Sequence, residues 1–132
     1  DLAGRTGPGE MSLKELLPVL VHTSLTGDPF IKRIVFDMAE KYGIDRISSH
    51  ADALASRQNY SDILAEVNCP VLIIHGSDDK LCPVEIHKHM ETIIPGSKRV
   101  EINNCGHLSS LEKPELVSIP LNKWLEEYFQ AE

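Results

Sequence analysis

The sequence lacks the features that would suit a membrane, a nucleic acid or a disulfide-rich fold. Its longest apolar runs are a handful of residues, so no membrane span is expected, and no signal peptide is visible. Acidic residues outnumber basic ones by 20 to 13, which gives a net charge of −7, and no basic patch points to nucleic acid. Three widely spaced cysteines do not make a disulfide framework, which favours a reduced, cytoplasmic protein.

Internal repeats, low-complexity tracts and an initial methionine are also missing. The chain begins at Asp1, which we interpret as the start of a processed or truncated chain. Residues 1–12 are rich in glycine and polar side chains and are expected to form a flexible lead-in. The length of 132 residues is that of one ordinary domain.

One apolar and one β-branched segment each lead to a polar side chain of the kind used in catalysis. Residues 71–74 lead into a Gly-x-x-Asp turn that ends at Asp79, and residues 99–102 lead into Asn-Asn-Cys-Gly-His, which ends at His107. Both segments are predicted to be strands, and residues 83–94 between them have helical character. A strand, a helix and a strand in this order predict parallel strands whose carboxyl ends carry both side chains.

This arrangement resembles the C-terminal half of an α/β-hydrolase. In that superfamily the catalytic residues follow the order Ser, Asp or Glu, His. Asp79 and His107 fall on the last two positions, 28 residues apart. The ending Cys-Gly-His-Leu-Ser-Ser-Leu-Glu-Lys-Pro-Glu, with Leu-Val-His, Asp-Pro, Met-Ala-Glu and Ile-Pro-Gly upstream, is similar to small-ester and enol-lactone hydrolases. The resemblance covers residues 13–128 and is tighter after Cys69.

The resemblance implies a catalytic triad. A serine hydroxyl is a poor nucleophile at neutral pH, so an imidazole must accept its proton while a carboxylate holds the imidazole's tautomer. We therefore assign His107 as general base and later acid, with Asp79 as its orienting carboxylate. Asp78 is the competing carboxylate, but neighbours in a tight turn point apart and the family register selects Asp79. Either motif alone is often only a turn or a loop cap.

The nucleophile of such a triad is absent from this sequence. Ser77 and Ser97 each follow a glycine, but neither lies in a Gly-x-Ser-x-Gly turn. By the family's chain order, this turn and the oxyanion-hole segment belong upstream of residue 1. Only two strands are visible, whereas a doubly wound sheet has about five or more. We therefore expect a fragment that is inactive alone and that associates with its missing N-terminal half or with a second copy.

The fold class predicted is α/β: a parallel sheet flanked by helices, preceded by a helical cap. Residues 13–68 resemble the family's cap, and residues 69–132 form the C-terminal part of the core. Ser12 opens a capping box at the start of the cap, Pro18 should kink or restart the first helix, and Asp28 starts a helix that ends at Gly43.

Two further helices are expected. One covers residues 44–57, and the other covers residues 114–130 with an interruption at Pro120. The buried apolar stripe predicted for the last helix consists of Val117, Leu121, Trp124, Leu125 and Tyr128.

Other chemistry-bearing residues are interpreted structurally. Cys105 is expected to be a packed thiol rather than a nucleophile. Cys82, His87 and His89 could suggest a metal site, but helix positions two apart do not share a face, so both histidines are expected to be solvated. Separately, Met38 is expected to belong to the core. No metal or cofactor is expected.

We predict a hydrolase of small carboxylic esters or lactones. Two alternatives stay open: a non-catalytic module that binds a ligand or partner, and a dehalogenase- or peroxidase-type relative.

Overall fold

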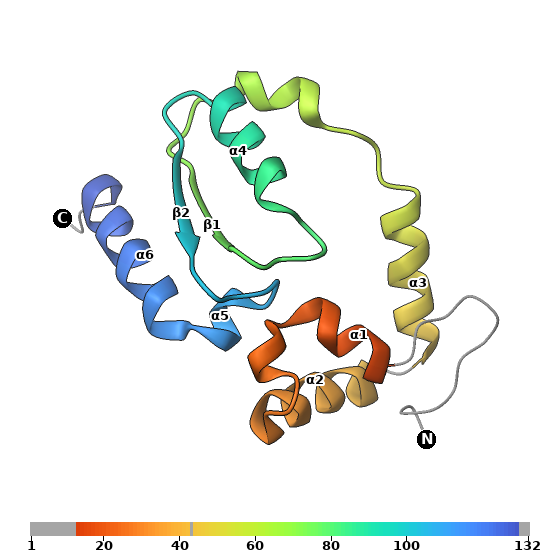
Figure 1. Cartoon of the computed structure of the whole chain (residues 1–132). Coiled ribbons are helices and arrows are strands. Elements are labelled where there is room, and N and C mark those ends of the chain that lie inside the picture. Colours follow the sequence, from red (N-terminus) through yellow and green to blue (C-terminus); the bar gives the residue numbers. More distant parts are fainter. Residues whose placement is uncertain (1–12, 43, 130–132) are drawn as a thin grey trace. The chain divides into compact units, whose positions relative to one another are not determined.

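The computed structural model describes residues 13–42 and 44–129, which form two compact units (Figure 1). Described residues of the first unit are 13–18, 23–42 and 44–59. The second unit consists of Val19–His22 and residues 60–129. Among the described helices, none is long and apolar enough to cross a membrane. The predicted lead-in, residues 1–12, lies outside the described part of the chain.

The first unit is helical. It holds most of α1 (Leu13–Leu20), the 3-10 turn η1 (Thr23–Leu25), α2 (Pro29–Tyr42) and α3 (Ile44–Ala55). Pro18 lies inside α1 rather than at its end. The capping residue proposed for α1, Ser12, is outside the described residues.

Asp28 starts α2 as the sequence predicted. Its Oδ1 accepts hydrogen bonds from the backbone N–H groups of Phe30 and Ile31, at 2.8 and 3.0 Å. Ile31 and Val35 of this helix are buried. The prediction that Met38 belongs to the core is wrong, because the burial of α2 is concentrated in its first two turns and Met38 is 56% exposed.

Two parallel strands form the sheet of the second unit. Strand β1 (Leu72–Gly76) pairs with β2 (Lys98–Ile102), and α4 (Val84–Ile93) connects them. The register places Gly76 opposite Ile102, so the loops that follow both strands start at the same edge. The predicted strand, helix, strand crossover is confirmed. The 3-10 segment η2 (Ser61–Glu66) precedes β1.

Helices lie on both sides of this sheet, with α4 on one side and α6 (Pro114–Tyr128) on the other (Figure 1). Along β1, Ile73 and His75 are buried, whereas Leu72 and Ile74 between them are half-buried. Such alternation is expected for a strand whose faces are covered to different degrees.

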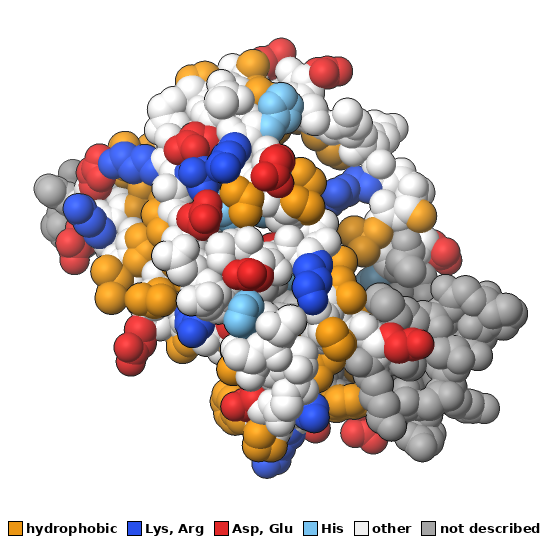
Figure 2. Space-filling model, in the orientation of Figure 1, with side chains coloured by type: hydrophobic (Ala, Val, Ile, Leu, Met, Phe, Trp, Pro, Cys, Tyr) orange, Lys and Arg blue, Asp and Glu red, His pale blue; other side chains and the backbone are white. Residues whose placement is uncertain are grey.

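The last helix differs from its prediction. Helix α6 is continuous through Pro120, and a short helix that was not expected, α5 (Ser109–Glu112), precedes it. The predicted stripe is not buried: Val117 and Trp124 are half-buried, while Leu121, Leu125 and Tyr128 are exposed. A two-stranded sheet is too narrow to cover a 15-residue helix. Figure 2 shows hydrophobic side chains gathered over α6.

Candidate functional site

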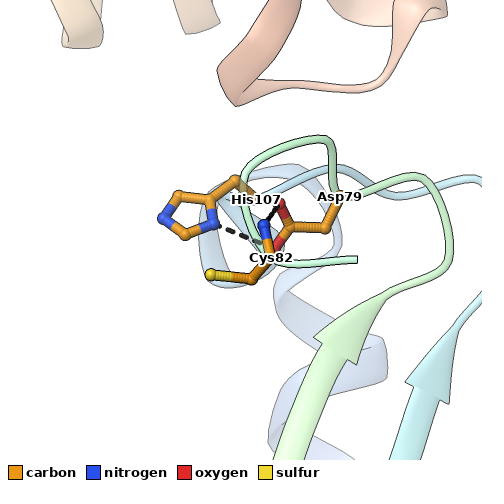
Figure 3. Close-up of side chains that lie close together, drawn as sticks. All are labelled: Asp79, Cys82 and His107. Atoms are coloured by element: carbon orange, nitrogen blue, oxygen red, sulfur yellow. Dashed lines mark hydrogen bonds and ion pairs between the residues drawn. The ribbon is translucent and has the colours of Figure 1, made fainter. Parts of the chain in front are cut away.

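The two predicted site residues are in contact. Asp79 follows β1 and His107 follows β2, and His107 Nδ1 lies 2.9 Å from Asp79 Oδ2 (Figure 3). The Asp79 side chain is 5% exposed, whereas that of His107 is 36% exposed. A buried carboxylate therefore holds an imidazole that reaches solvent.

The acid loop, residues 77–83 between β1 and α4, surrounds Asp79 with hydrogen-bond donors. Its Oδ1 accepts from the backbone N–H groups of Leu81 and Cys82, both at 2.9 Å. Burial by itself would raise the pKa of Asp79, but the hydrogen bonds from Cys82 N–H, from the His107 ring and from Leu81 N–H outweigh it and hold this pKa below its usual value. The carboxylate is therefore charged at neutral pH, with one oxygen fixed by its own loop and the other facing the ring.

Asp78 has a different role from its neighbour. Its Oδ2 accepts a hydrogen bond from Ser77 Oγ at 2.5 Å, and Ser77 Oγ in turn accepts one from Asn104 N–H at 3.0 Å. The backbone N–H of Asp78 donates to Cys105 O at 2.8 Å. These contacts tie the acid loop to the histidine loop, residues 103–108 between β2 and α5. Asp79 is the carboxylate that contacts His107.

The contact with Asp79 determines which nitrogen of His107 can act. An ionised carboxylate only accepts hydrogen bonds, so Nδ1 must carry the proton that it donates. The lone pair of a neutral ring then lies on Nε2. In Figure 3 this second nitrogen points away from Asp79. The arrangement suits a base that accepts a proton at Nε2.

Two contacts from distant parts of the chain fix the histidine loop. The backbone N–H groups of His107 and Leu108 donate to Leu20 O, at 2.9 and 3.1 Å. The carboxylate of Glu112 accepts from Gly106 N–H at 3.1 Å and from His22 N–H at 2.9 Å. Sequence reasoning missed both contacts, because no motif links the segment around Leu20 to the histidine loop.

Glycine is required where these backbones meet. A Cβ added at Gly76 would lie 2.2 Å from Cys105 O and 2.3 Å from Gly106 O. A Cβ at Gly106 would lie 2.7 Å from backbone atoms of Val21 and His22. A side chain at Gly76 would push β1 away from the loop that carries His107, and one at Gly106 would push that loop away from the segment Val19–His22. Both glycines therefore help to keep His107 in place.

The cysteines differ sharply in their surroundings. Cys105 is fully buried, and burial, followed by the charge of Glu112, raises the pKa of its thiol to about 11. It is thus a packed thiol, as predicted. Cys82 is half-buried and lies beside Asp79 and His107, so that one ligand atom from each of the three residues falls within 4.8 Å of the others (Figure 3).

The predicted solvated histidines also differ. His89 is exposed, but His87 stacks on the buried His75 with ring centres 4.2 Å apart and an interplanar angle of 8°. The prediction of a solvated residue is therefore wrong for His87, because α4 packs this side chain against β1.

Comparison with known proteins finds relatives among hydrolases. A curated relative, a proline iminopeptidase of Lactobacillus crispatus, is 38% identical over 69 residues, which are 52% of this chain and 23% of the relative. A 2-hydroxy-6-oxononadienedioate/2-hydroxy-6-oxononatrienedioate hydrolase of Cupriavidus pinatubonensis is 28% identical over 111 residues, 80% of this chain and 37% of the relative.

Among solved structures, a thermophilic esterase from Thermogutta terrifontis superposes with a TM-score of 0.80 at 28% identity, covering 87% of this chain and 43% of the esterase. The chain thus spans less than half of each of these three relatives. The sequence profile of the alpha/beta hydrolase fold matches residues 27–114. The chain therefore belongs to the α/β-hydrolase family.

Proposed function

We propose that this chain is the C-terminal half of a serine hydrolase that acts on small carboxylic esters or lactones. The observation that carries the proposal is the contact between Asp79 and His107, with Nε2 of the ring turned away from the carboxylate. The similarity to an esterase at 28% identity supports the class of substrate.

In the proposed reaction, His107 Nε2 accepts the proton of a serine hydroxyl as that oxygen bonds to the acyl carbon. Asp79 stabilises the resulting imidazolium through Nδ1–H. The imidazolium then gives its proton to the leaving alcohol, and a water molecule, activated by the same nitrogen, hydrolyses the acyl-enzyme. The serine would come from polypeptide outside these 132 residues, since the chain has no Gly-x-Ser-x-Gly turn.

The polypeptide with the serine is also the partner that we propose for this chain. Among the described residues, β1 pairs only with β2, which leaves the second edge of β1 without a strand. The apolar side chains of α6 also lack full cover: Leu116 is 49% exposed and Ile119 is 66% exposed. An unpaired edge and an apolar helix face both favour association.

Sedimentation of the purified protein tests this partnership. We expect a complex with the nucleophile-bearing polypeptide, and a self-associated species when that polypeptide is withheld. A monomer with strongly protected amides in β1 and no binding of a hydrophobic dye would contradict the proposal.

Hydrolysis of a short-chain p-nitrophenyl ester tests the proposed function. The 132-residue chain alone should show no turnover above buffer, and the complex should be active. In the complex, His107→Ala should lower kcat by roughly three to four orders of magnitude, whereas His89→Ala, which removes an exposed histidine of α4, should leave kcat unchanged. Turnover by the chain alone that disappears with His107→Ala would reveal a nucleophile within it.

Amide hydrolysis is a second candidate, favoured by the similarity to proline iminopeptidases. It would use the same base. A proline p-nitroanilide assayed beside the ester decides between the two substrates.

The cytoplasmic location predicted from the cysteines stays a prediction; Cys69, Cys82 and Cys105 are all free thiols in the structure.

A further inference from the structure

Three different metal-binding side chains converge at the edge of the sheet. Asp79 offers a carboxylate oxygen, Cys82 a thiol sulfur and His107 an imidazole nitrogen, and these atoms all lie within 4.8 Å of one another. Asp79 Oδ2 and His107 Nδ1 are 2.9 Å apart. Figure 3 shows the thiol of Cys82 on the side of the carboxylate where the ring lies.

The 2.9 Å separation of the oxygen and the nitrogen is shorter than the ligand separations of a tetrahedral zinc site, and the 4.8 Å upper limit for all three atoms is longer. With Zn–S near 2.3 Å and Zn–N and Zn–O near 2.0–2.2 Å, the ligand atoms of such a site are separated by about 3.3–3.8 Å. Small side-chain rotations would therefore bring the three atoms to the required spacing. The half-buried Cys82 and the 36% exposed His107 side chain leave the ion a route from solvent.

We propose that Asp79, Cys82 and His107 bind a thiophilic divalent cation such as Zn²⁺, with water in the fourth position. The donor set supports this choice, since thiolate and imidazole favour zinc over calcium or magnesium, which take oxygen ligands. Asp79 Oδ1 would remain hydrogen-bonded to Leu81 and Cys82 N–H and so hold the ligating carboxylate in place.

Binding of the ion displaces protons from Cys82 and from His107 Nδ1. The thiol of Cys82 loses its proton to solvent as sulfur bonds to the ion. The Nδ1 proton of His107 leaves as that nitrogen bonds to the ion, and the neutral ring carries its proton on Nε2 instead. Metal binding therefore releases one proton overall and inverts the tautomer of His107.

The inverted tautomer has a consequence that rests on the proposed function. A ring that carries its proton on Nε2 cannot accept one from a serine hydroxyl at that atom. Bound zinc would thus switch off the base, and removal of the ion by a chelator would restore it.

Cobalt substitution tests the site without any measurement of activity. The protein is used as purified, with any polypeptide that remains bound to it, and Co²⁺ is added in the absence of other metals. We expect a thiolate-to-cobalt charge-transfer band that saturates at a single ion per chain and is displaced by Zn²⁺. Cys82→Ser should abolish this band and weaken Zn²⁺ binding by about 100-fold or more.

The matched control is Cys69→Ser, which removes an exposed thiol outside the cluster and should leave the band intact. A band that survives in Cys82→Ser, or a folded wild-type protein that gives no band, would overturn the proposal. If the variant does not fold, the wild type alone still tests the site. Zn²⁺ should slow alkylation of Cys82 by iodoacetamide and leave the alkylation of Cys69 unchanged. Equal protection of both cysteines would also overturn the proposal.

Ester hydrolysis by the complete enzyme then separates this proposal from the proposed function. Zn²⁺ should inhibit the wild type far more than Cys82→Ser. If the cobalt band depends on Cys82 but Zn²⁺ leaves hydrolysis unaffected, the metal site stands and the role of His107 as base is wrong.

Discussion

The acid and histidine loops and helix α2 are held in place by different kinds of contact. In α2 the side-chain contacts are local: Asp28 caps the helix at Phe30 and Ile31, and Arg33 pairs with Asp37 one turn later. At the loops the contacts join residues far apart in the sequence. His107 and Asp79 are 28 residues apart, and His22 and Glu112 are 90 apart.

The two kinds of contact make the two regions depend on different parts of the chain. A helix specified by its cap and apolar stripe forms largely from neighbouring residues. The loops reach their geometry only when β1, β2 and the segment Val19–His22 are all in position, because each supplies a group that the others contact. Substitutions at the loops should therefore disturb function and folding far more than equivalent substitutions around α2.

The sharpest comparison lies within the acid loop itself. In the proposed serine hydrolase, Asp79→Asn should lower kcat by roughly three to four orders of magnitude, because a neutral amide no longer fixes the tautomer of His107 or stabilises its charged form. Asp78→Asn should be much milder, since Asp78 contacts Ser77 and the histidine-loop backbone rather than the ring. Steady-state ester hydrolysis measures both. Equal losses would show that the assignment of Asp79 is wrong.

Alanine substitution of one glycine in each region compares how strongly the two regions affect the free energy of unfolding. Gly76→Ala places a methyl group 2.2 Å from Cys105 O, so we expect destabilisation at or above the upper end of the roughly 1–3 kcal/mol that overpacking costs. Gly27→Ala, which precedes α2, meets nothing within 4 Å and should be neutral or stabilising by about 0.4–1 kcal/mol. Urea unfolding of both variants provides the measurement. Similar effects at the two sites would contradict the comparison.

The same difference explains what the sequence could predict. The cap at Asp28, the two strands and the crossover helix follow from local patterns, and the pairing of Asp79 with His107 follows from two such strands in parallel. The resemblance to a known family added the register that favoured Asp79 over Asp78. Each of these features depends on residues close in sequence or on one crossover connection.

What the sequence could not show depends on packing between distant segments. Nothing near His107 indicates that Leu20 accepts its backbone hydrogen bond, or that Glu112 also binds His22. The stack of His87 on His75 was missed for the same reason. The exposure of Met38 was mispredicted because helical periodicity shows which face is apolar but not how far along the helix it is covered.

Glu112 tests whether one carboxylate joins the histidine loop to the segment around His22. Glu112→Gln keeps one acceptor oxygen but loses the charge, so we expect a loss of about 1.5 kcal/mol, at the lower end of the range for hydrogen bonds to charged groups. Glu115→Gln, at an exposed position of α6, should change stability by less than about 0.5 kcal/mol. Thermal or urea unfolding compares the two. Equal losses of stability in the two variants would mean that the hydrogen bonds of Glu112 to Gly106 and His22 do not stabilise the fold.

The smallest expected effect is a pH dependence from the stack of His87 on His75. Burial lowers the pKa of His87, the nearby His75 lowers it further, and together these outweigh the opposing effects of Pro83 O and Asp79. The folded chain therefore binds a proton at His87 less readily than the unfolded chain, whose histidine has its usual pKa of about 6.5. Stability should be fully present above about pH 6.5 and should fall as the pH drops from there through the folded pKa.

Urea unfolding at a series of pH values between about 5 and 8 measures this dependence. His87→Gln removes the titrating group, so it should flatten the fall in unfolding free energy below about pH 6.5. His89→Gln, on the exposed side of the same helix, should keep the wild-type slope. The lowered pKa of Asp79 affects stability only near and below its usual value of 3.8, so its contribution lies outside this range. An unchanged slope in His87→Gln would show that the stack is indifferent to protonation, and a changed slope in His89→Gln would assign the effect to the wrong histidine.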